Sequence, residues 1–231
     1  MKPIDKIEFD YIFNIPDKDE LRFHIALDSK TLDYIPPATV QTAPWAALEN
    51  EKCANCPLNS KQHKYCPIAL NLVSILPCFT DIYSYQETTV SVHTSIRSYQ
   101  TKTTLQRGLG SMLGIYMVSS GCPVMAKLKP MVRYHLPFAS IEETVFRAAS
   151  TYLLGQYFKH KNGQKADWSL SDLVHIYEEV QKVNMAIAER LRSVPAKDAN
   201  INALIVLDVF AKELPMNIEN HLKPLEYLFE H

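Results

Sequence analysis

The sequence predicts an α+β protein in which a four-stranded antiparallel sheet, in residues 1–100, is covered by a C-terminal layer of four to five helices, in residues 101–231. Two observations predict this class. Apolar residues alternate with polar ones near the N-terminus, and after about residue 100 they recur at helical spacing. Because a sheet with one apolar face must bury that face, we expect a single domain over residues 1–231, with a cysteine-rich insertion at residues 38–66.

Four segments are expected to form the sheet. Apolar side chains occupy every second position from residue 7 to 15 and again from residue 21 to 27, so these two runs predict an antiparallel hairpin. A short third strand is expected at Leu32–Ile35, before two prolines that lack the backbone donor for further pairing. The fourth strand is expected at Thr88–Tyr99, with one apolar face formed by Val90, Val92 and Ile96.

The helices are expected mainly in the second half of the chain. A short apolar helix is predicted at Ile68–Leu76, and a longer one carries Leu105 to Met117 together with three of the six glycines, which favours close helix packing. Ser140 and Glu143 form a capping box that begins the next helix, which runs to about Phe158. Further helices are expected at about residues 171–191, 198–212 and 222–229.

Composition narrows the class of protein. Lys and Arg total 24 against 25 Asp and Glu, so there is no overall positive field to attract nucleic acid or an anionic membrane. We expect no secretion signal, because residues 1–5 lead directly into strand-like sequence. The most apolar stretch, residues 201–210, is about half of the ~20 residues that a membrane span needs. A cytoplasmic protein is therefore expected.

Three of the five cysteines lie within fourteen residues and predict a metal site. Two thiolates three residues apart can bind one ion from a tight turn, and a second pair can complete a tetrahedron. The resulting zinc site would consist of Cys53, Cys56, His63 and Cys66. The spacing is compatible with zinc but does not identify it, since only one Cys-x2-Cys pair is present.

Other interpretations of these cysteines stay open. Cys56, Cys66 and Cys122 each precede a proline, a context found around iron-sulfur ligands, so Cys122 could replace His63 as the fourth ligand of such a cluster. A thioredoxin-like dithiol fits less well, because an irregular stretch rather than a strand precedes Cys53. A further interpretation is that the thiols are reduced and simply buried, with no cofactor, and Cys78 is expected to be plain core.

A second group of residues suggests an anion or acid-base site. Arg133 and His135 lie shortly before the helix that carries Glu142, and Cys122 precedes them by about ten residues. Structural roles compete with this interpretation, since Glu143 belongs to the capping box and Arg147 can pair with it one turn later. Arg133, His135 and Glu142 are thus catalytic candidates without a nucleophile fixed by spacing.

Several of these segments resemble a small bacterial protein family of unknown function. The resemblance is carried by Pro44-Trp45, Cys53-x2-Cys56-Pro57, Cys66-Pro67, Ser120-Gly121-Cys122-Pro123 and the run from Arg133 to Ala139. It extends over most of the chain and implies a bacterial cytosolic protein, but it implies no activity, substrate or ligand.

The function predicted from the residues is that of a metal-stabilised regulatory or partner-binding protein of the cytosol, whose partner is an unidentified protein or small molecule. The alternative is an iron-sulfur or thiol-dependent enzyme with a site near Cys122, Arg133 and His135. A cleft that holds these three residues beside the other cysteines would favour the enzyme.

Overall fold

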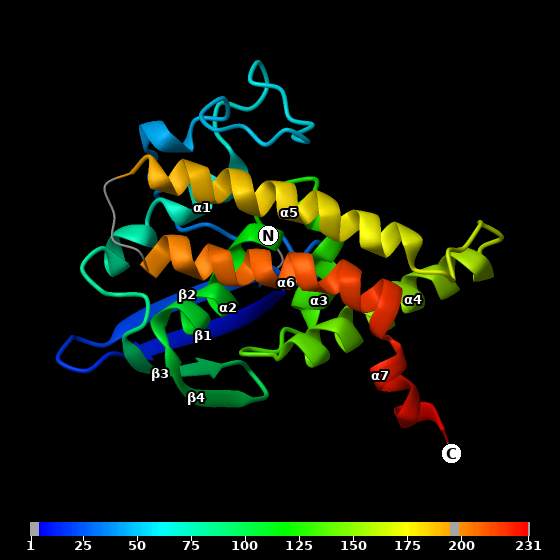
Figure 1. The fold of residues 1–231 in the computed structure, drawn as a ribbon. Helices are drawn as coiled ribbons and strands as arrows, with labels where there is room; N and C mark the ends of the chain where they lie inside the picture. The colour runs from blue at the N-terminus through cyan, green and yellow to red at the C-terminus, as the bar shows by residue number, and fades with distance from the viewer. Residues whose placement is uncertain (1–4, 195–198, 231) are drawn as a thin grey trace.

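The computed structural model describes residues 5–194 and 199–230 and confirms the predicted α+β class. Four strands form one antiparallel sheet in the order β2-β1-β3-β4 (Figure 1). The strands are β1 (Lys6–Asn14), β2 (Leu21–Asp28), β3 (Glu87–His93) and β4 (Ser98–Thr104). The hairpin predicted from the alternating runs is therefore confirmed as β1 and β2.

The apolar face of the sheet follows the period of two in the sequence. Phe9 pairs with Ile25, Tyr11 with Val92, and Phe13 with Val90, and all six side chains are buried. The alternating residues of β1 and β2, such as Asp10 and His24, are exposed and hydrogen-bond to each other on the opposite face. Burial on one face only is what an antiparallel sheet with a single covering layer requires.

Two strand predictions are wrong in detail. Residues 32–35 make only an isolated bridge, from Tyr34 to Leu27, because Leu32 adopts a positive φ of 59° that breaks the extended conformation. The strand predicted at Thr88–Tyr99 is the hairpin of β3 and β4. Its turn is closed at Thr94, whose backbone and side chain both bond Arg97, and Ile96 lies at the tip, 79% exposed.

Seven α-helices are found in the described residues. They are α1 (Pro67–Leu72), α2 (Leu105–Val118), α3 (Lys129–Arg133), α4 (Ile141–Lys161), α5 (Ser171–Arg192), α6 (Ala199–His221) and α7 (Lys223–Glu226). Short 3-10 helices lie at residues 44–46, 76–79, 125–128 and 227–229.

The helix boundaries agree with prediction best where a local signal exists. Helix α4 begins with the predicted capping box, in which Ser140 Oγ accepts from the Glu143 N–H and Glu143 in turn accepts from the Ser140 N–H. Helix α6 is longer than expected and contains Pro215, whereas the predicted start at Asp198 lies outside the described residues. Helix α1 ends at Leu72 rather than Leu76.

The helices stack outward from the sheet. Helix α2 contacts β3 and β4, α6 packs on α2, and α5 lies along α6 (Figure 1). The insertion at residues 38–66 lies beside α5, on the side away from the sheet. Within the described residues no helix combines the length and apolar composition that crossing a membrane requires.

Candidate functional site

The cysteine-rich insertion is held on the fold by one buried arginine. Arg190 of α5 is 1% exposed, and its Nη1 donates to the carbonyl oxygens of Trp45 (2.7 Å) and Ala47 (2.5 Å), while Nη2 donates to that of Leu48 (3.3 Å). A second link joins the Asn55 amide to Glu179, also on α5. These bonds fix the backbone on which the cysteines lie, although the segment has almost no regular structure.

Four of the five thiols share one neighbourhood. Cys66 and Cys122 are buried, and Cys53 and Cys56 are partly buried and pack against the core. Burial, and after it the charges of Cys66, Cys122 and Cys56, raise the pKa of the Cys53 thiol to about 12. The fold therefore brings Cys122 to the cysteines of the insertion, as the iron-sulfur interpretation expects.

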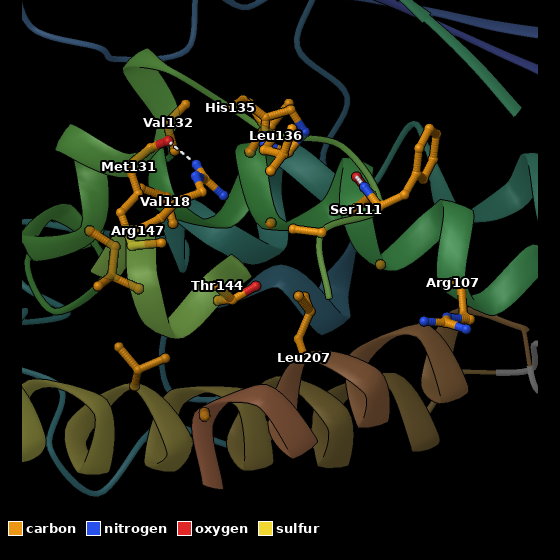
Figure 2. A pocket seen from close by; sticks show the side chains of 18 of the residues that line it. Arg107, Ser111, Val118, Met131, Val132, His135, Leu136, Thr144, Arg147 and Leu207 are labelled. Carbon is orange, nitrogen blue, oxygen red and sulfur yellow. Dashed lines mark hydrogen bonds between the residues drawn. The ribbon is translucent and has the colours of Figure 1, made fainter. Parts of the chain in front are cut away.

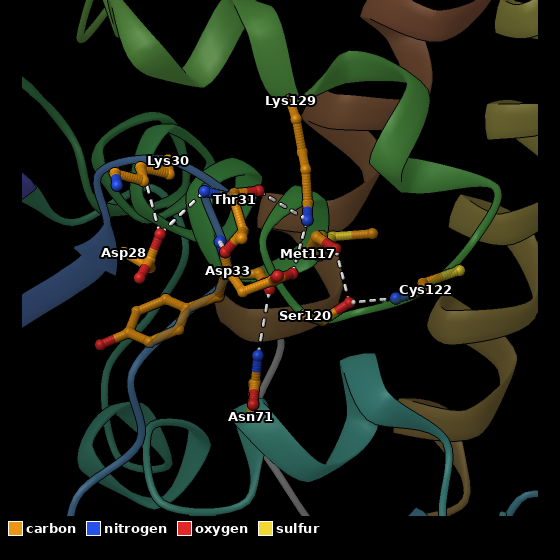
Figure 3. A network of polar contacts seen from close by, with 10 residues as sticks. Asp28, Lys30, Thr31, Asp33, Asn71, Met117, Ser120, Cys122 and Lys129 are labelled. Atoms are coloured by element: carbon orange, nitrogen blue, oxygen red, sulfur yellow. Dashed lines mark hydrogen bonds and ion pairs between the residues drawn. The ribbon is translucent and has the colours of Figure 1, made fainter. Parts of the chain in front are cut away.

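Cys122 follows α2 in a tight turn. Asn71 of α1 donates to the Tyr116 carbonyl of α2 (3.3 Å), which joins the helix that follows Cys66 to the helix that precedes Cys122 (Figure 3). The Cys122 N–H donates to Ser120 Oγ (3.2 Å). Burial raises the pKa of the Cys122 thiol, whereas hydrogen bonds from the backbone N–H groups of Met125 and Val124 lower it. Backbone N–H groups aimed at sulfur stabilise a thiolate.

The zinc interpretation with His63 has no comparable support from the described residues. His63 is exposed in a turn where its N–H donates to the Asn59 carbonyl (2.9 Å). In the part of the chain that the structure describes, no three His, Cys, Asp or Glu side chains stand in an arrangement that could hold a metal ion. The metal site therefore stays a prediction. The assignment of Cys78 to the core is wrong, because its side chain is exposed beside the 3-10 turn at residues 76–79.

A separate cavity of about 330 Å³, open to the surface, lies between the sheet and the helices (Figure 2). Its walls come from β4, α2, α3, α4, α5 and α6, and most of the lining is apolar, including Val118, Met131, Val180 and Leu207. Gly110 and Gly114 of α2 face the cavity, and their lack of side chains leaves it open. The third glycine, Gly108, instead packs on β3, where an added Cβ would lie 2.7 Å from Val90 Cγ2.

A chain of polar groups runs from buried Tyr11 to the partly buried Ser111 and His135, which line this cavity. Tyr11 Oη lies 2.6 Å from His135 Nε2 and 3.0 Å from Ser111 Oγ, and Ser111 also accepts from the Phe138 N–H (3.4 Å). Burial, and then the charge of Arg147, lower the pKa of His135 to about 3. His135 is therefore neutral at physiological pH, which leaves Arg147 as the charged group beside it.

A polar side chain also lines the cavity from α5. Asn184 is 2% exposed, and its Oδ1 has no hydrogen-bond partner among the described residues. It lies on the apolar stripe of this helix, with Val180 one turn before it and Ile187 one turn after it. A polar residue on such a stripe is the sequence signal that could have identified it.

The catalytic candidates do not form one cluster. Arg133 is exposed and lines a second hollow of about 470 Å³ at the surface, to which His135 and Arg147 also contribute. Glu142 is exposed in the first turn of α4. Cys122 lies in the walls of neither hollow. The described residues thus do not place Cys122, Arg133 and His135 in a common cleft.

Comparison with known proteins gives a family but no activity. A family model described as a domain of unknown function (DUF6901) matches residues 7–230. No curated protein and no solved structure matched the chain.

Proposed function

The chain belongs to the family of the domain of unknown function DUF6901, and we propose from its own geometry that it is a small-molecule-binding protein whose binding site is the cavity beneath the sheet. The observation that carries the proposal is the Asn184 amide, which is buried at the cavity wall and whose Oδ1 has no partner within the part of the chain that the structure describes. More of the lining is apolar than polar, and this combination of an apolar hollow with a few converging polar groups is typical of ligand sites.

The energetic argument is that an empty cavity of this kind is costly. A buried polar atom without a hydrogen bond costs about 1–3 kcal/mol, and each missing contact across a void weakens packing as well. A ligand that donates a hydrogen bond to Asn184 and fills the apolar space would remove both costs. Two glycines in the middle of α2, each about 1 kcal/mol worse than alanine in a helix, are consistent with a requirement for open space.

The proposal can be tested with 1-octanol as a neutral amphipathic probe. We expect octanol to raise the melting temperature of the wild-type protein and to shift the NMR signals of residues that line the cavity. In Gly114→Leu the new side chain would enter the cavity, since only Leu207 Cδ2, at 3.8 Å, lies near the added Cβ. This variant should lose the response.

Gly155→Leu is the matched control, because Gly155 lies in α4 and an added Cβ there meets nothing within 4 Å. It should respond to octanol as the wild type does. If octanol shifts neither protein, or if folded Gly114→Leu responds as strongly as the wild type, the cavity is not a binding site.

A second candidate role is metal binding by Cys53, Cys56, Cys66 and Cys122, and it is supported by the clustering of these four thiols. An ion there would tie the insertion to the turn after α2 and add to the anchoring by Arg190. The protein would then be a metal-stabilised binding protein of the cytoplasm, where thiols stay reduced. A [4Fe–4S] cluster and zinc both accept four thiolates.

The test is anaerobic purification followed by elemental analysis and a visible spectrum, repeated for Cys122→Ser and His63→Ala. Near-stoichiometric iron or zinc that is lost in Cys122→Ser and kept in His63→Ala supports the four-thiolate site. Metal lost in His63→Ala and kept in Cys122→Ser supports the zinc site with His63 instead. If the wild type carries neither metal and Cys53→Ser does not change its stability, the thiols are simply buried.

A further inference from the structure

Arg147 lies in the wall shared by the cavity of about 330 Å³ and the second hollow of about 470 Å³ at the surface. It contributes to the lining of both, as do His135 and Leu136. A group bound at Arg147 is therefore within reach of the surface, while anything attached to it can extend into the apolar interior. This position suits a ligand with a polar head and an apolar body.

The guanidinium of Arg147 is held in place by hydrogen bonds from one of its nitrogens, and its other two nitrogens are available as donors. Its Nη2 donates to the carbonyl oxygen of Met131 (2.8 Å; Figure 2) and to that of Tyr134 (3.0 Å), and these two bonds fix the plane of the group. Nη1 and Nε have no acceptor among the described residues. Each of these two donors can give a single charge-assisted hydrogen bond to an anion, while Nη2 stays on the two carbonyls.

The charges around Arg147 favour an anion. No Asp or Glu among the described residues lines the cavity, whereas Lys102 and Arg107 do, with Arg107 at the end away from Arg147 (Figure 2). The charge of Glu143, one turn before Arg147 on α4, acts on Arg147, but Glu143 lines neither hollow. The surface hollow is lined by more basic than acidic residues. The basic ones are Lys6, Arg97, Arg133 and Arg147, and the acidic ones are Asp5 and Glu8. Burial lowers the pKa of Arg147, so the site disfavours its charge, and a bound anion would offset that cost.

We propose that the ligand is an amphipathic monocarboxylic acid whose carboxylate binds Arg147 and whose apolar chain fills the cavity toward Val118, Val180 and Leu207. This inference rests on the cavity-binding function proposed above. It assigns Arg147 the role of binding the head group and leaves Asn184 to accept a hydrogen bond from a hydroxyl group, where the natural ligand carries one.

The test compares four probes of equal chain length on the wild-type protein: octanoate, methyl octanoate, 1-octanol and octylamine. Dissociation constants are measured by isothermal titration calorimetry at neutral pH. Octanoate should bind about tenfold or more tighter than methyl octanoate and octanol, because a charge-assisted pair contributes more than about 1.4 kcal/mol. Octylamine should bind most weakly, because its cation would lie next to Arg147. This comparison requires no variant and is independent of any folding defect.

Two variants then locate the head group. Arg147→Gln removes the positive charge, and it should lose most of the preference for octanoate over methyl octanoate. Arg107→Gln should keep the preference for octanoate. If Arg107→Gln loses this preference instead, the carboxylate binds at Arg107 and the assignment to Arg147 is overturned.

The outcomes separate the two proposals. If octanol binds and Gly114→Leu abolishes its binding, but octanoate binds no tighter than methyl octanoate, the inference about the acid is overturned and the cavity-binding function stands. If none of the four probes binds, both proposals fail.

Discussion

Tyr11 and His135 join the centre of the sheet to the wall of the cavity. The Tyr11 hydroxyl lies 2.6 Å from His135 Nε2, across 124 positions of sequence, and the same hydroxyl lies 3.0 Å from Ser111 Oγ of α2. Strand β1, helix α2 and the segment before α4 therefore meet at one buried hydroxyl group. Because buried polar groups are costly when left without partners, this meeting point should be sensitive to substitution.

Tyr11→Phe should lower the free energy of unfolding by about 1–2 kcal/mol, because it removes a buried hydroxyl that two partly buried polar groups share as a partner. Chemical denaturation monitored by circular dichroism measures this. Tyr134→Phe is the control, since that ring is 78% exposed, and it should leave the stability unchanged. Equal stability of Tyr11→Phe and the wild type would mean that the hydroxyl contributes nothing to the fold.

His135 should make stability fall as the solution is acidified. Its pKa is lowered from an ordinary 6.5 to about 3 in the folded protein, so between these values the unfolded chain binds the proton more readily. The stability that neutral His135 contributes is thus complete above 6.5 and is lost as pH falls toward 3.

The slope of this loss should be about 1.4 kcal/mol per pH unit in the middle of the window. We expect His135→Gln to have a flatter profile than the wild type between about pH 7 and pH 5, above the range where most carboxylates titrate. His63→Gln, at an exposed position, should retain the wild-type profile. Parallel profiles for wild type and His135→Gln would contradict the burial of a neutral imidazole.

The glycines of α2 should respond in opposite directions to the same substitution. Gly108→Ala should destabilise the protein by about 1–3 kcal/mol, because its Cβ would lie 2.7 Å from Val90 Cγ2 and 3.2 Å from Phe13 Cε1. Gly114→Ala should stabilise it by up to about 1 kcal/mol, because there is room for the Cβ and alanine is the better helix former. Thermal unfolding of both variants tests this, and destabilisation by Gly114→Ala would show that this side of the helix is tightly packed.

Arg190→Met should release the cysteine-rich insertion. Three backbone carbonyls would lose their donor, at a cost of about 3 kcal/mol in unfolding free energy, and limited proteolysis between residues 49 and 64 should become faster. Arg192→Met on the same helix is the control, because Arg192 makes only an exposed pair with Glu189. Unchanged proteolysis of Arg190→Met would mean that other contacts hold the segment.

Local patterns in the sequence determined the class of fold and most of its elements. The alternation in β1 and β2, the capping box at Ser140 and the apolar stripe of α5 each depend on neighbouring residues alone, which is why they could be predicted. The errors occurred where a distant contact or a special backbone angle decided the conformation, as at Leu32 and at the turn closed by Thr94.

The sites depended on the tertiary structure to a larger degree. The cysteines and His135 could be named from residue type, but the proximity of Cys122 to the insertion is set by the packing of α1 against α2, through Asn71. The cavity was not predicted at all, since it is formed by what six separate elements leave unfilled. Whether glycine packs closely or leaves space depends on the opposing element, and so Gly108 and Gly114, on one helix, could be distinguished only in the folded protein.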